Sequence, residues 1–261
     1  MEFKIETMAD YAARGEKPEV LFWVGCAGSF DERAQKITRA VAKIFHHSCV
    51  KFAVLGTEES CTGDPAKRAG NEFLFQMQAM MNIQVLNGYE VTRIVTACPH
   101  CFNTLKNEYP ELGGHYEVIH HSELLQTLIN DGRLSVSGGA FSGKKITFHD
   151  PCYLGRGNSV YEAPREVIQK LDSALSEMKR SRAKGFCCGA GGAQMFKEPE
   201  QGTKDVNVER TEEALALNPD VIAVACPFCL TMMTDGVKNF NKEQDVKVLD
   251  IAELIATAND L

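Results

Sequence analysis

The chain has 261 residues, of which 44% are hydrophobic and 24% are charged, a composition typical of a folded globular protein. Its formal net charge is −7 at pH 7, and no run of lysine and arginine interrupts this acidic balance. Nucleic acids and anionic membrane surfaces bind basic patches, so the charge argues against both kinds of partner.

The first segment, residues 1–19, carries charged side chains throughout and has no apolar block. This pattern predicts a polar surface helix and excludes a signal peptide or a spanning helix in that segment. We therefore expect a cytoplasmic protein without a membrane span of its own, which reaches a membrane only through partner subunits.

The first half alternates short apolar runs with helical periodicity, which is typical of an α/β fold. Asp31 is placed to cap the first helix after the opening strand, and Asp64-Pro65 begins a second helix. The predicted strands and helices follow one another at residues 20–24, 31–45, 52–55, 64–88 and 91–97.

Two features of this half are interpreted as buried. Phe73, Met77, Met80 and Met81 recur at helical spacing and are assigned to the core. Cys49 lies at the end of a predicted helix and is interpreted as a buried free thiol.

The second half repeats this plan, so the chain is a duplicated unit. The apolar pattern of residues 20–26 recurs at 146–152, and that of 94–99 recurs at 222–227. A joint rich in serine and glycine spans 135–145. We predict two α/β domains related by a pseudo-twofold axis, each with its own core, at residues 20–135 and 144–261.

All but one of the ten cysteines fall into two matched sets. The interval from Cys26 to Cys61 equals that from Cys152 to Cys187, and each set closes with a Cys-x-x-Cys motif at a strand end. The first set contains Cys26, Cys61, Cys98 and Cys101, and the second contains Cys152, Cys187, Cys188, Cys226 and Cys229. The sets are unequal, because aligning Gly63 with Gly189 places Thr62 where the second set has Cys188.

Cysteines in a reducing compartment indicate metal ligands or redox groups, since disulfides rarely persist there. Four thiolates can hold either zinc or an iron–sulfur cluster. Structural zinc usually takes two local pairs, whereas each set here joins distant single cysteines to one Cys-x-x-Cys. The adjacent pair Cys187-Cys188 chelates one small ion poorly, but it could reach two irons of a larger cluster.

No flavin or nicotinamide cofactor is expected. The glycines after Cys188 do not complete the dinucleotide motif G-x-G-x-x-G, because Gln194 stands where the last glycine is required.

The second set, with the Cys187-Cys188-Gly189 segment between Cys152 and Cys226-Pro227-Phe228-Cys229, resembles the cysteine-rich CCG-domain proteins, whose best-known type is a cysteine-rich component of heterodisulfide reductase. The resemblance extends from about Val20 to Leu254. It implies a noncubane [4Fe-4S] cluster held by all five cysteines of the second set. Thr62 departs from the pattern, so the first set is expected to hold an ordinary [4Fe-4S] cluster or another metal, or to be a vestigial site.

The resemblance also implies a function, that of an iron–sulfur subunit of an oxidoreductase complex. Such a subunit carries electrons to or from a disulfide, quinone-linked or flavoprotein partner, and its partners are ferredoxin-type iron–sulfur proteins or flavoproteins. If the cluster itself is catalytic, Cys187 and Cys188 would hold the iron that meets the substrate.

Two alternatives remain open at this point. The chain is also similar to electron-relay subunits of lactate or glycolate oxidation systems. A third function, of a different class, is a zinc-bound interaction module without redox activity, which the four cysteines of the first set would permit and the fifth cysteine of the second set disfavours.

Two histidines lie beside the cysteines. His100 is inside the first Cys-x-x-Cys and His149 precedes Cys152, so either could tune a cluster or carry a proton. Their counterparts in the other repeat are Phe228 and Trp23. The pair His120-His121 precedes a predicted helix, where capping and packing account for it.

Overall fold

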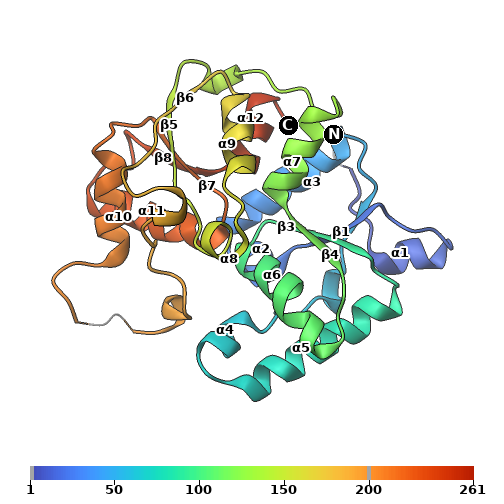
Figure 1. Ribbon diagram of the computed structural model, residues 1–261. Coiled ribbons are helices and arrows are strands. Elements are labelled where there is room, and N and C mark those ends of the chain that lie inside the picture. Colours follow the sequence, from blue (N-terminus) through green and yellow to red (C-terminus); the bar gives the residue numbers. More distant parts are fainter. Residues whose placement is uncertain (1–2, 199–200) are drawn as a thin grey trace.

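The computed structural model describes residues 3–198 and 201–261, so Met1 and Glu2 of the predicted polar segment lie outside it (Figure 1). Its helices are α1 Met8–Ala13, α2 Gly25–Phe30, α3 Ala34–His47, α4 Asp64–Arg68, α5 Glu72–Gly88, α6 Pro99–Asn103, α7 His121–Asn130, α8 Gly155–Asn158, α9 Glu162–Gln169, α10 Val206–Leu215, α11 Pro227–Asn239 and α12 Ile251–Ala258. Its strands are β1 Val20–Trp23, β2 Phe52–Ala53, β3 Arg93–Thr96, β4 Glu117–His120, β5 Lys145–Phe148, β6 Ala174–Leu175, β7 Val221–Val224 and β8 Lys247–Asp250.

The strands form two parallel sheets with the same topology. The first has the order β2-β1-β3-β4 and the second has the order β6-β5-β7-β8. Strands β1 and β7 are buried along their whole length, as expected for short apolar strands covered on both faces. The predicted duplicated α/β fold is therefore confirmed.

The two halves exchange helices, so their cores are not separate as the duplication suggested. Helix α7 of the first half packs against α9 of the second, and α12 of the second half packs against α3 of the first (Figure 1). The buried apolar residues of both halves form one contiguous cluster. The cores are joined because α12 buries Ile251, Leu254 and Ile255 in this shared interior.

Buried polar side chains link equivalent positions of the two halves. His120 caps the N-terminus of α7, and Asp250 caps that of α12 in the same way. His121 lies between them, with Nδ1 3.2 Å from Nε2 of His120 and Nε2 2.9 Å from Oδ1 of Asp250. The capping and packing roles predicted for the histidine pair are thus observed, and both roles serve the junction between the halves.

The methionine stripe of α5 is not part of the core, which corrects the sequence-based assignment. Phe73, Met77, Met80 and Met81, which were assigned to the core together, are 75%, 46%, 61% and 59% exposed. The helix instead buries a second set at helical spacing, which includes Phe75, Ala79, Asn82, Ile83 and Leu86. Periodicity identified one apolar face of α5, which is the exposed one. The helix has a second apolar face, and this second face packs against the core.

Cys49 is also exposed, contrary to the prediction of a buried thiol. It follows the end of α3 and has a φ of +53°, a left-handed conformation in the turn between the buried residues Ser48 and Val50. Among the described residues, no helix combines the length and the apolar character needed to cross a bilayer.

Candidate metal centre

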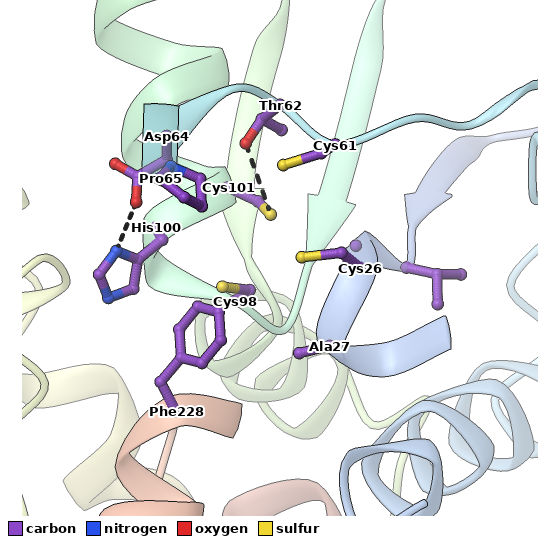
Figure 2. Close-up of a pocket in the computed structure, with 12 residues that line it drawn as sticks. Cys26, Ala27, Cys61, Thr62, Asp64, Pro65, Cys98, His100, Cys101 and Phe228 are labelled. Carbon is purple, nitrogen blue, oxygen red and sulfur yellow. Dashed lines mark hydrogen bonds and ion pairs between the residues drawn. The ribbon is translucent and has the colours of Figure 1, made fainter. Parts of the chain in front are cut away.

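The four cysteines of the first set line one cavity at the carboxyl ends of β1 and β3 (Figure 2). Cys26 lies in α2 directly after β1, Cys98 precedes α6, and Cys101 lies within α6. Cys61 lies in the loop that leads to α4. Figure 2 shows the four sulfur atoms pointing toward one another, so the fold brings the predicted set together.

The five cysteines of the second set also converge. Cys188 and Cys229 are buried, and their Sγ atoms lie 3.3 Å apart. Cys152 interacts with Cys187, and Cys226 interacts with Cys229. All ten cysteines are free thiols, so none of these contacts is a disulfide.

In each set, hydrogen bonds between the thiols favour the thiolate form at particular cysteines, among them Cys98, whose pKa is held well below its usual range by Cys101 and then by Cys226. The hydrogen bond from Cys26 lowers the pKa of Cys61 to about 7, and that from Cys152 holds the pKa of Cys187 far below its usual range. The backbone N–H groups of Gly63 and Gly189 support these thiolates at 3.5 Å and 3.2 Å. The thiolate is the form that binds metals, so both loops present a ligand already in its reactive state.

Thr62 occupies the position of the fifth cysteine in the first set. Its side chain is 2% exposed, and Oγ1 lies 4.0 Å from Sγ of Cys101. The pair Thr62 and Cys101 thus corresponds to Cys188 and Cys229 in the second set. The fifth position therefore carries a hydroxyl group in the first set and a thiol in the second.

The two sites adjoin one another across the junction between the halves. The thiols of Cys98 and Cys226, the first cysteines of the two Cys-x-x-Cys motifs, lie close enough that each affects the pKa of the other. The ring of His100 lies 4.3 Å from that of Tyr153 and 5.1 Å from that of Phe228. Both of these aromatic residues belong to the second half, so each motif contributes to the surroundings of the other.

Neutral side chains hold the loop of the first site. Asn82 donates to the carbonyl oxygen of Cys61 and to the hydroxyl of Tyr109, both at 3.0 Å. The Tyr109 hydroxyl donates in turn to the carbonyl oxygen of Thr62 at 3.1 Å. Sequence reasoning missed these residues, although Asn82 interrupts an otherwise apolar helix face and could have been noticed.

A carboxylate supports the other side of the first site. Glu59 accepts hydrogen bonds from the backbone N–H groups of Val24 and Gly25, at 3.0 Å and 2.6 Å. Gly25 has a φ of +77°, and a Cβ atom there would lie 3.2 Å from Sγ of Cys101. The turn that delivers Cys26 therefore needs glycine.

Charged side chains hold the corresponding loop of the second site. Arg165 forms a bidentate ion pair with Asp150 at 2.7 Å and 2.9 Å. It also donates a hydrogen bond to Glu177 at 2.6 Å. Asp150 accepts the backbone N–H of Arg182 at 2.8 Å, at the start of the segment that leads to Cys187. Sequence reasoning assigned no role to Asp150 or Arg165.

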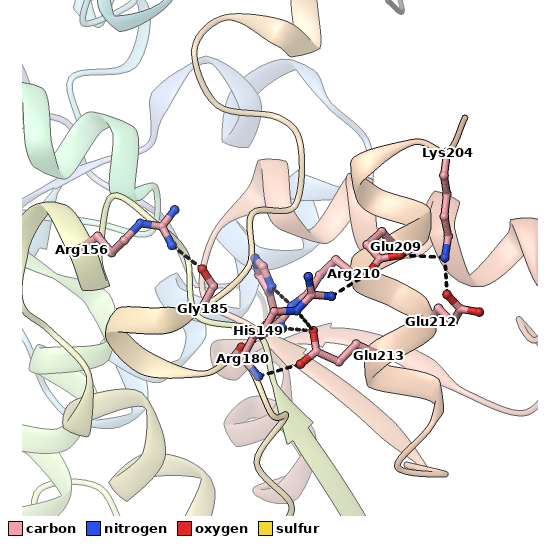
Figure 3. A network of polar contacts seen from close by, with 9 residues as sticks. All are labelled: His149, Arg156, Arg180, Gly185, Lys204, Glu209, Arg210, Glu212 and Glu213. Carbon is pink, nitrogen blue, oxygen red and sulfur yellow. Dashed lines mark hydrogen bonds and ion pairs between the residues drawn. The ribbon is translucent and has the colours of Figure 1, made fainter. Parts of the chain in front are cut away.

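His149 lies behind the second site, in a network of polar contacts (Figure 3). Nε of Arg210 donates to Nδ1 of His149 at 3.0 Å. Burial, followed by the nearby Arg210 charge, lowers the pKa of His149 to about 3, so the ring is neutral. By contrast, His100 forms a 2.8 Å contact with Asp64 through Nδ1 and sits between the two sites.

These features define a class of protein. Buried and half-buried free thiols, each group with a stabilised thiolate, form a donor set suited to a soft metal ion or an iron–sulfur cluster. Nε2 of His149, a buried polar atom, has no hydrogen-bond partner among the described residues, which fits a site completed by a bound group.

The chain belongs to the cysteine-rich CCG domain family. The family model matches it twice, at residues 20–106 and 146–234. The two matches cover the two halves, each with its own cysteine set.

Three curated relatives extend this comparison. The chain is 48% identical over 97% of its length to a probable iron-sulfur-binding oxidoreductase, FadF, of Bacillus subtilis, and covers 36% of that protein. It is 43% identical over 92% of its length to the EtfAB:quinone oxidoreductase of Syntrophomonas wolfei, and covers 34% of it. It is 32% identical over 93% of its length to one polypeptide of the dihydromethanophenazine:CoB–CoM heterodisulfide reductase of Methanosarcina barkeri, and covers 59% of it. The chain thus spans about a third of the first two relatives.

Proposed function

We propose that this chain is the iron–sulfur module of an oxidoreductase complex of the heterodisulfide reductase type. The observation that carries the proposal is the convergence of five free cysteines at the second site, with Cys188 and Cys229 in contact at 3.3 Å. The relatives named as iron–sulfur or quinone oxidoreductases support the same function.

The second site is proposed to hold a noncubane [4Fe-4S] cluster. Cys187 and Cys188 are adjacent in the chain, but Cys187 interacts with Cys152 and Cys188 contacts Cys229. A single small ion cannot readily bind two adjacent cysteines that face different partners, whereas a cluster with several metal atoms can bind both cysteines. When bound, the cluster accepts and releases single electrons, and the protein supplies the thiolate at Cys187 that anchors it.

The first site is proposed to hold an ordinary four-cysteine cluster. Its cysteines share one cavity, and the Thr62 hydroxyl in the fifth position is a poor iron ligand. Cys98 and Cys226 lie close enough to affect the pKa of one another, so we propose that electrons pass between the two adjoining sites.

The relatives are longer than this chain, so we propose that it works with further redox modules. The S. wolfei relative is named for a quinone and the M. barkeri relative for a heterodisulfide. A quinone-linked partner is favoured over a disulfide, since the relative named for a quinone has the higher identity to this chain, 43% against 32%.

Metal and acid-labile sulfide analysis of protein purified without oxygen tests this proposal. Brown protein that contains iron and sulfide is expected, with a paramagnetic signal on reduction. Colourless, zinc-loaded protein without sulfide would overturn the proposal and favour an interaction module. A change of the signal on adding a disulfide substrate would support direct chemistry, and an unchanged signal with a competent partner would favour electron relay.

A further inference from the structure

The two ring nitrogens of His149 have different surroundings. Nδ1 accepts a 3.0 Å hydrogen bond from Arg210 (Figure 3), whereas Nε2 is buried and has no partner in the part of the chain that the structure describes. A ring nitrogen of His149 and the Sγ atoms of Cys188 and Cys229 all lie within 4.8 Å of one another. Buried polar atoms nearly always have a partner, so we expect Nε2 to find one when the second site is occupied.

Arg210 determines which nitrogen of His149 carries the proton. A guanidinium group has only N–H donors and no acceptor, so Nδ1 must offer its lone pair. A neutral imidazole with a free lone pair on Nδ1 carries its proton on Nε2. Nε2 is therefore a hydrogen-bond donor and is not available as a metal ligand.

The guanidinium group is itself fixed in place. Arg210 is fully buried, and its NH1 group donates to Oε2 of Glu213 at 3.0 Å and to the carbonyl oxygen of Arg180 at 2.8 Å. Arg180 also donates to Glu213 at 2.8 Å. These contacts from α10 and the loop before the second site prevent Arg210 from turning away from His149.

We propose that His149 donates its Nε2 proton in a hydrogen bond to a sulfur atom of the cluster at the second site, and that Arg210 is a positioning residue that selects this tautomer. The inference rests on the proposed function, since it requires a cluster there. A hydrogen bond to cluster sulfur stabilises the more negative, reduced state and raises the reduction potential.

The first half offers an independent parallel. Trp23 occupies the position of His149, and its indole Nε1 is likewise buried without a partner among the described residues. An indole nitrogen is always a donor, so it needs no residue to select a tautomer. Both halves therefore place a ring N–H group at the same position, and only the histidine requires an arginine behind it.

Redox titration of the second-site paramagnetic signal tests this assignment. His149→Leu removes the donor and is expected to shift the midpoint potential to more negative values. His149→Gln keeps an N–H donor and is expected to shift it less, and Arg210→Met is expected to give an intermediate shift. An unchanged potential in His149→Leu protein with an intact cluster would overturn the inference.

Measurements on the unaltered protein cover the case in which a variant fails to assemble the cluster. With ¹⁵N-labelled histidine, double-resonance spectroscopy is expected to show coupling of the second-site cluster to a histidine nitrogen and to its exchangeable proton. Absence of both couplings would overturn the inference. Trp23→Phe is the matched control and should leave the second-site potential unchanged. Protein without iron and sulfide would instead overturn the proposed function itself.

Discussion

The two cysteine sites are built on the same sheet topology, yet their loops are held by different chemistry. Neutral groups, Asn82 and Tyr109, hold the backbone of Cys61 and Thr62 at the first site, whereas the buried ion pair of Asp150 and Arg165 holds the loop of the second. The sites also differ in ligand number, because Thr62 replaces the fifth cysteine. The repeated strands thus fix where ligands stand, and the residues after the strand ends decide what each site can bind.

The largest expected effect is the loss of one site alone. Cys188→Ser removes a buried thiol that contacts Cys229 at 3.3 Å, so it should abolish the second-site cluster and leave the first intact. Iron and sulfide content, together with the paramagnetic spectrum, measures how much cluster each site holds. Thr62→Ser is the matched control at the equivalent position and should change neither site. Equal loss at both sites after Cys188→Ser would mean that the fold depends on the second cluster.

The converse change should make the sites alike. Thr62→Cys places a thiol where the hydroxyl lies 4.0 Å from Sγ of Cys101. We expect the first-site spectrum to change toward that of the second site. A first-site spectrum identical to that of the unaltered protein would show that ligand number alone does not distinguish the sites.

Breaking the ion pair should destabilise the second half specifically. Arg165→Met leaves Asp150 buried without its partner, and removal of one member of a buried pair costs about 3–5 kcal/mol. Urea unfolding under anaerobic conditions measures the free energy of unfolding. Arg165→Lys keeps the charge but not the bidentate geometry, so the free energy of unfolding should fall by less than in Arg165→Met. A loss below about 1 kcal/mol, typical of an exposed ion pair, would contradict the assigned role.

The glycines that follow the loop cysteines should give the smallest effects. Gly63 and Gly189 have φ values of +88° and +96°, and alanine in a left-handed conformation costs about 1–2 kcal/mol. Gly63→Ala should cost more, because its Cβ atom would lie 2.8 Å from the Phe75 ring, against 3.2 Å from Met232 and Val206 at Gly189. Gly70 has a φ of +85° and no atom within 4 Å of the position of a Cβ atom. Gly70→Ala therefore measures the cost of the left-handed backbone alone, without crowding. Equal losses for all three variants would show that crowding is unimportant.

Much of the fold could be predicted because it depends on local patterns that occur twice. The apolar runs ending at Cys26 and Cys152 identify equivalent strands, and the equal spacing of the cysteines identifies equivalent loops. Parallel strands place their carboxyl ends at one edge, so the convergence of each cysteine set followed from the strand assignment.

Other features depend on contacts that no local pattern encodes. The apolar faces of α5 were both visible in the sequence, but periodicity does not say which one meets the core, and Met80 proved exposed while Ala79 is buried. The exchange of α7 and α12 between the halves is invisible for the same reason. Arg210 is far from His149 in the chain, and only the fold shows that their side chains meet.

The exchanged helices bear on how the two sites came to differ. A half-length ancestor would leave the apolar faces that meet α7 and α12 open to water, so two copies would have to associate and exchange these helices. Every substitution in such a homodimer would alter both sites at once. In a single chain that holds both copies, each site can change alone, so one site can carry a threonine where the other carries a cysteine.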